Sequence, residues 1–122
     1  MASEDEISGF IGSSFRSVWS LELLLLLKGD TRLWPRAEMV AALRASDLIV
    51  AQGLEALTAA GLVVIDEAGN AAYRPASDDI ARLADATDSL YARSPDAVRR
   101  LIVGAISDPL AAFADAFRLR KE

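Results

Sequence analysis

The chain has 122 residues, of which 52% are hydrophobic, and a formal net charge of −5. This length and apolar content fit a single domain with a buried core. The absence of cysteine excludes a disulfide scaffold, a zinc finger and thiol catalysis, and the absence of histidine removes the commonest general base and metal ligand. We therefore expect no enzyme activity, and accordingly no catalytic residues, no metal site and no cofactor.

The acidic balance argues against a non-specific nucleic-acid binder, because such proteins usually carry a basic face. The acids concentrate at the start, where residues 1–27 contain four acidic residues and one arginine. A signal peptide would begin with basic residues, and the apolar run at residues 23–27 is too short to span a membrane. The sequence predicts a cytoplasmic location and no membrane partner.

The first part of the chain divides into a polar segment and an apolar one. Residues 1–12 are acidic and contain two glycines, which predicts a flexible tail. A first helix is predicted from Ser13 or Ser14, either of which can cap it, to Lys28, with Gly29 just beyond its end. Because this helix is apolar on nearly all sides, we expect it in the centre of the core or in a dimer interface.

Two tryptophans are large enough to anchor a ligand or a partner. On a helix as apolar as the first one, Trp19 is expected to belong to the core, with ligand stacking as the alternative. Trp34 precedes Pro35, which favours an extended backbone, and we expect its ring to fold inward over the second helix. The alternative for Trp34 is a recognition anchor.

The sequence predicts two helices and a β-hairpin in the middle of the chain. The second helix is predicted from Pro35, a favourable first residue, to about Arg44. Ser46 caps a third helix that ends at Gly61, the expected left-handed cap. Residues 62–66 and 71–74 flank a turn at residues 67–70, which predicts a β-hairpin.

The C-terminal third of the chain contains three sequence signals that mark the N-terminus of a helix. Ser77 caps a fourth helix, Ser94-Pro95 opens a fifth and Asp108-Pro109 opens a sixth. The sixth predicted helix carries Leu110, Phe113 and Phe117 at helical spacing on one face. This face and Val103 of the fifth helix are the predicted interface for a second copy or a protein partner.

The order of three helices and a hairpin, joined by Thr-Ala-Ala-Gly-Leu-Val at residues 58–63, resembles the winged helix-turn-helix of bacterial MarR-like transcriptional regulators. The likeness covers residues 17–75, about half of the chain. It implies a mostly α (α+β) fold, with a two-stranded wing and two to three additional C-terminal helices. The whole chain is then expected to form one compact domain, with the winged helix at residues 13–76. The helices at residues 77–122 are expected to pack on the core, to form a dimer interface, or to do both.

The resemblance implies a DNA-binding regulator, acting as a homodimer, whose third helix enters the major groove. On the expected outer face of that helix only Gln52 is a strong base reader, and no arginine or lysine lies between Ala45 and Tyr73. The remaining candidate contacts to double-stranded DNA, through phosphates, are Arg36, Arg44 and Arg74.

The alternative function is a winged helix repurposed as a protein–protein interaction module that does not bind DNA. Its basis is the acidic third helix and wing, which carry Asp47, Glu55, Asp66 and Glu67 where DNA-binding relatives of this fold carry basic residues.

Overall fold

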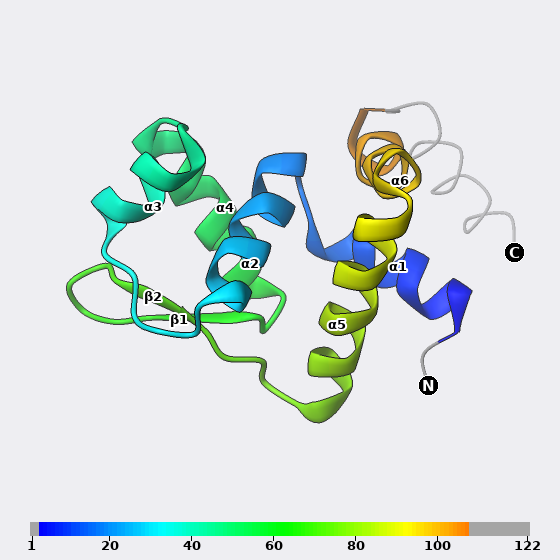
Figure 1. Cartoon of the computed structure of the whole chain (residues 1–122), viewed down its shortest axis with the longest axis horizontal. Coiled ribbons are helices and arrows are strands. Elements are labelled where there is room, and N and C mark those ends of the chain that lie inside the picture. Colours follow the sequence, from blue (N-terminus) through cyan, green and yellow to red (C-terminus); the bar gives the residue numbers. More distant parts are fainter. Residues whose placement is uncertain (1–2, 108–122) are drawn as a thin grey trace, which may run out of the picture.

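The computed structural model describes residues 3–107. In chain order the elements are α1 (Glu4–Ser14), α2 (Val18–Gly29), α3 (Arg36–Leu43), α4 (Asp47–Ala59), β1 (Val63–Ile65), β2 (Ala71–Tyr73), α5 (Asp78–Arg93) and α6 (Pro95–Ser107). Figure 1 shows α3, α4 and the hairpin at one end of the molecule, α1, α5 and α6 at the other, and α2 between them. The predicted fold class, mostly helical with a two-stranded antiparallel wing, is confirmed. The predicted sixth helix, with Leu110, Phe113 and Phe117, lies outside the described residues.

Helix α1 corrects the prediction that residues 1–12 form a flexible tail. Ser3 and Glu6 make a capping box, in which Ser3 Oγ accepts from the Glu6 N–H at 3.2 Å and Glu6 Oε1 accepts from the Ser3 N–H at 3.4 Å. Ile11 and Phe15 are fully buried in the core, and α1 packs against α5 and α6. Burial of these apolar side chains stabilises the segment despite its polar composition.

Helix α2 is the central helix of the fold. It begins at Val18, later than predicted, because Ser17 is the N-cap and its Oγ accepts from the Ser20 N–H at 3.2 Å. Its inward leucines are completely buried, and the helix packs against α4 and β2. The prediction that Trp19 belongs to the core is wrong, since the side chain is 41% exposed. Trp19 lies in the first turn of α2, at the rim of a pocket that it shares with Tyr91 and Arg99.

The crossing of α4 over α2 is close because a glycine lies at the contact. A Cβ atom on Gly53 would be 3.1 Å from Leu23 Cδ2 and 3.7 Å from Ser20 Cα. The buried side of α4, formed by Val50, Gly53, Leu54 and Leu57, faces the core. This packing determines which side of α4 faces solvent.

We expect Gly53→Leu to destabilise the protein by about 2–3 kcal/mol, because the added side chain overpacks the α2–α4 contact. Gly53→Ala should be nearly neutral, since the higher helix propensity of alanine, about 1 kcal/mol, offsets the tight contact. Urea denaturation measures both effects. The control is Gly9→Ala, whose new Cβ meets nothing within 4 Å. Wild-type stability in Gly53→Leu would contradict the close crossing.

The wing is tied to the segment between α2 and α3. Trp34 forms an antiparallel bridge with Ala71, in which the two backbone N–H···O distances are 2.7 and 2.9 Å. The Trp34 ring is buried as predicted, and its indole N–H donates to the Asp30 carbonyl at 2.9 Å. The bridge gives the order Trp34–β2–β1 across the sheet, so β1 is the edge strand.

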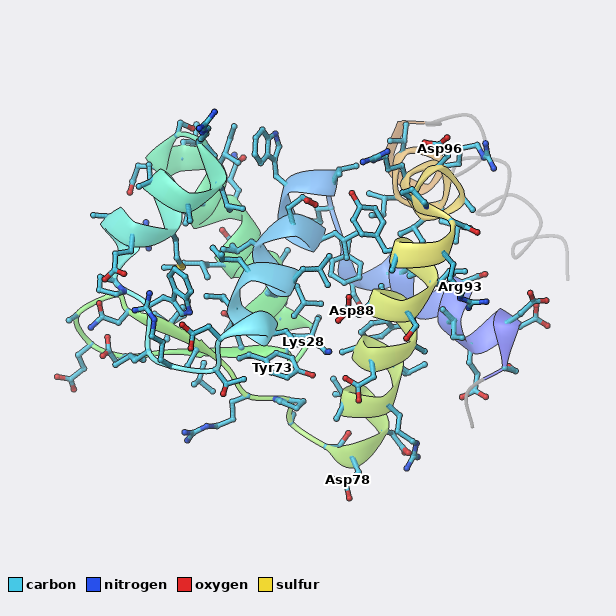
Figure 2. All side chains as sticks on the ribbon, viewed as in Figure 1. Lys28, Tyr73, Asp78, Asp88, Arg93 and Asp96 are labelled. Carbon is cyan, nitrogen blue, oxygen red and sulfur yellow. The ribbon has the colours of Figure 1, made fainter. Side chains whose placement is uncertain are left out.

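Helices α5 and α6 pack beside α2 and α1, and an ion pair joins α5 to the end of α2. The Lys28 ammonium lies 3.0 Å from a carboxylate oxygen of both Asp85 and Asp88. Figure 2 shows Lys28 reaching toward the side of α5 where Asp88 lies. Burial opposes the charge of Lys28, but hydrogen bonds to the two carboxylates outweigh it and raise the pKa of the ammonium. On the alkaline side, the stabilisation from the Lys28 charge is therefore complete at neutral pH and is lost as the pH rises through the raised pKa of the ammonium.

Candidate nucleic-acid interface

The outer face of α4 carries the predicted base reader. Leu48, Gln52 and Glu55 are exposed there, and Leu48 is the most exposed large apolar side chain in the described chain, at 65%. Ser46 caps the helix as predicted, because its Oγ accepts from the Ile49 N–H at 3.1 Å. Asp47 lies in the first turn, where a carboxylate is stabilised by the positive end of the helix dipole. This face combines one amide, two acids and an apolar side chain.

Arg36, a predicted phosphate contact, is already paired. Its Nη1 lies 3.5 Å from Asp47 Oδ1, which joins α3 to the first turn of α4. Its Nε is buried and has no hydrogen-bond partner among the described atoms. A phosphate would have to compete with the Asp47 carboxylate, so Arg36 is the least available of the predicted basic contacts.

Arg44 and Arg74 lie at opposite ends of α4. Arg44 is exposed and ends α3 in the left-handed conformation, with φ of 55°, immediately before the segment that caps α4. Arg74 is exposed after β2 and lines a groove with Thr58, which belongs to the last turn of α4. In the part of the chain from residue 3 to residue 107, neither guanidinium makes an ion pair.

Arg16 is a candidate that the sequence did not reveal. It is exposed in the link between α1 and α2, and it lines a pocket of about 310 Å³ together with Gln52 and Glu55 of α4. It also makes no ion pair with any of residues 3–107. Packing of α2 against α4 brings it there, and no local pattern predicts this. The one available signal is that Arg16 is the only basic residue before Lys28.

The tip of the wing is acidic. Asp66 accepts hydrogen bonds from the N–H groups of Ala68 at 3.0 Å and Asn70 at 2.9 Å, and from the Asn70 side-chain amide at 3.1 Å. The backbone bond from Asn70 is the main reason that the pKa of Asp66 is lowered. The turn is therefore most stable above the ordinary pKa of an aspartate, and loses this contribution as the pH falls through the lowered value. Glu67 is exposed beside it.

A second polar cluster joins α2, α5 and α6. The Tyr91 hydroxyl donates to Glu22 Oε2 at 3.3 Å and accepts from Arg99 Nη2 at 3.1 Å. With Trp19 these residues line a pocket of about 330 Å³. The polar groups are partnered within the protein, so the cluster mainly holds the three helices together. Val103 of the predicted interface is exposed on α6, and the other predicted members lie outside residues 3–107.

Other kinds of site are not indicated in the described residues. Among them, no group of three or more acidic, histidine or cysteine side chains is placed to hold a metal ion. No single helix between residues 3 and 107 is long and apolar enough to cross a membrane, and α1 and α2 pass that test only together, bent by 106°. No protein-family model, curated protein or solved structure matches the chain.

Proposed function

We propose that the chain is a winged-helix transcriptional regulator, MarR-like in kind, that binds double-stranded DNA as a homodimer. The observation that carries the proposal is the placement of Arg16, Arg44 and Arg74 beside the middle, the start and the end of α4, all without an ion pair within residues 3–107. With α4 in the major groove, these arginines are suited to contact phosphates on either side of it.

Gln52 is the proposed base contact. It lies on the exposed face of α4 next to Arg16, and a glutamine amide can make two hydrogen bonds to the edge of an adenine. The acids Asp47 and Glu55 on the same helix repel phosphates, although Asp47 is partly neutralised by Arg36. We therefore expect recognition to depend on base contacts more than on general attraction to DNA.

The number of arginine–phosphate contacts indicates how strongly the protein should bind DNA. Three arginines in each protomer supply about six phosphate contacts in a dimer, the lower end of the range of roughly 6–10 for which affinity depends strongly on salt. Weak binding to random DNA follows from this number. A specific site should consist of two half-sites about 34 Å apart, which matches one turn of the duplex.

The test is selection of a DNA site from a random pool by the wild-type protein, followed by fluorescence polarisation with Gln52→Ala. We expect a loss of about 5- to 150-fold for each half-site, because a good bidentate contact contributes roughly 1–3 kcal/mol of discrimination, and so a loss of at least about 30-fold for the dimer on the selected site. Binding to random DNA should not change. The control is Ser89→Ala, exposed on α5. Failure to enrich any site, or wild-type affinity in Gln52→Ala, would reject the proposal.

A second candidate function is a protein-interaction module, favoured by Leu48. A leucine that is 65% exposed beside Asp47 suits a protein partner better than the phosphate backbone. In that case random-pool selection yields no DNA site. A complex of fixed stoichiometry isolated from native cells should then be lost in Leu48→Asp and kept in Ser89→Ala.

A further inference from the structure

Trp19 belongs neither to the core nor to the surface proposed for DNA. Its side chain is 41% exposed in the first turn of α2. It lines a pocket of about 330 Å³ with Tyr91, near the end of α5, and Arg99, in the first half of α6. A large aromatic side chain at the wall of a concave site is suited to stack against a ligand.

Two opposite charges line the same pocket. The Glu22 carboxylate accepts from the Tyr91 hydroxyl at 3.3 Å, and the Arg99 guanidinium donates to that hydroxyl at 3.1 Å. These bonds join the helices, but a hydroxyl does not neutralise either charge. Glu22 makes no ion pair within residues 3–107. Arg99 pairs with Asp96 at 3.3 Å, and both side chains are exposed, so this pair is weak. Each charge can therefore bind a ligand group of the opposite sign.

A ligand with a single charge does not suit this arrangement. A cation beside Glu22 is repelled by Arg99, and an anion beside Arg99 is repelled by Glu22. A zwitterion satisfies both side chains. Because both bind the same Tyr91 hydroxyl oxygen, the two charged groups lie close together. This short spacing fits an ammonium and a carboxylate on one carbon atom better than the two distant ends of a peptide.

The remaining wall of the pocket is apolar. Val18 and Trp19 line it beside the charged groups. An aromatic ring of a ligand can pack against the indole of Trp19 in an offset or edge-on arrangement. The volume of about 330 Å³ lies near the lower end of the range of roughly 300–1,000 Å³ for ligand pockets, so the pocket suits a small ligand.

We infer that this pocket binds a free α-amino acid with an aromatic side chain. The ammonium of the ligand binds Glu22, its carboxylate binds Arg99, and its ring packs against Trp19. Tyr91 holds the two charged side chains at a fixed separation. None of these residues belongs to the proposed DNA contacts, so the inference does not depend on that function.

The probe is L-phenylalanine, titrated to millimolar concentration into the isotope-labelled full-length protein and followed by NMR of the two indole N–H groups. We expect a saturable shift of the Trp19 signal, which is assigned by its loss in Trp19→Phe. The Trp34 signal is the internal control. It should not move, because Trp34 is buried and its N–H donates to the Asp30 carbonyl at 2.9 Å.

Two analogues of L-phenylalanine each lack one charge. Phenylethylamine has no carboxylate, and phenylpropionate has no ammonium. Each should bind the wild-type protein at least about tenfold more weakly than L-phenylalanine, because it loses one charge-assisted hydrogen bond and leaves a like charge unopposed. Equal affinity for the amine would indicate a cation site, equal affinity for the acid an anion site, and either result would overturn the inference.

Two variants separate ligand binding from a structural role. Glu22→Gln and Arg99→Gln should each bind L-phenylalanine at least about tenfold more weakly. Compared with the wild type, Glu22→Gln should bind phenylpropionate more tightly and Arg99→Gln should bind phenylethylamine more tightly, since each variant lacks the repelling charge. A role limited to joining the helices predicts no such reversal. The control is Arg82→Gln, exposed near the start of α5, which should behave as the wild type.

The inference is overturned if L-phenylalanine gives no saturable shift of the Trp19 signal, or if the variants show no reversal between the two analogues. A Trp19 signal that responds to protein concentration but not to L-phenylalanine would assign the indole to a contact between copies and would also overturn it. DNA binding is measured separately with Gln52→Ala, which leaves this pocket unchanged. A failure of this inference is thus distinguishable from a failure of the proposed function.

Discussion

Phe15→Ala is expected to destabilise the protein by about 3–5 kcal/mol, the usual cost of removing a fully buried phenylalanine. Its side chain is 1% exposed, and its ring packs edge-on against that of Phe10 with centroids 5.9 Å apart. The loss is large against the roughly 5–15 kcal/mol that stabilises a typical domain. Urea unfolding followed by far-UV circular dichroism measures it.

Trp19→Ala is the matched control, because it removes a larger aromatic side chain that is 41% exposed. It should cost clearly less than Phe15→Ala, since much of the indole is already in water. Ile11→Ala should fall in the range of about 2–5 kcal/mol, as for other buried aliphatic truncations. Wild-type stability in both Phe15→Ala and Ile11→Ala would mean that α1 does not contribute to the core.

The triple variant Arg16→Ala, Arg44→Ala and Arg74→Ala is expected to lose at least about 100-fold in affinity for a selected DNA site. Each dimer loses about six phosphate contacts, so the wild-type slope of log K against log salt, near −5, should become almost flat. Fluorescence polarisation over a series of salt concentrations measures the affinity and the slope together.

The control for charge removes three other arginines, Arg82, Arg93 and Arg100, which are exposed on α5 and α6. It changes the net charge equally but leaves the surroundings of α4 intact, so it should retain most of the affinity. Asp47→Asn should strengthen binding, since it releases Arg36 from its ion pair. Equal losses in the two triple variants would contradict a DNA surface centred on α4.

Local signals in the sequence predicted most of the elements. Ser46 and Ser77 each cap the expected helix, and their hydroxyl oxygens accept from the N–H groups of Ile49 at 3.1 Å and Ile80 at 3.2 Å. Gly61 adopts the predicted positive φ, 75°, between α4 and the wing. Pro35 is the N-cap of α3 and not its first helical residue, so the helix begins at Arg36, one residue later than predicted. Such signals act over a few residues, which is why sequence reveals them.

The errors concern features decided by packing. Helix α1 was missed although its Ser3–Glu6 capping box is visible in the sequence, because the acidic composition outweighed the apolar spacing of Ile11 and Phe15. Trp19 lines a pocket with Tyr91 of α5 and Arg99 of α6, so its exposure is a property of tertiary packing and not of the local sequence. The candidate site shows the same contrast. The exposure of Gln52 can be predicted from the helical periodicity of α4 alone, whereas Arg16 comes close to α4 only through the packing of other elements.

The packing of α1 against α5 and α6 also constrains how the protein is made. A nascent chain that has emerged only as far as the wing has the central helix but lacks the helices that cover Ile11 and Phe15. The apolar side chains of α1 therefore stay uncovered until α5 and α6 have also been synthesised. Closure of this part of the core is therefore a long-range event that follows formation of the winged-helix segment.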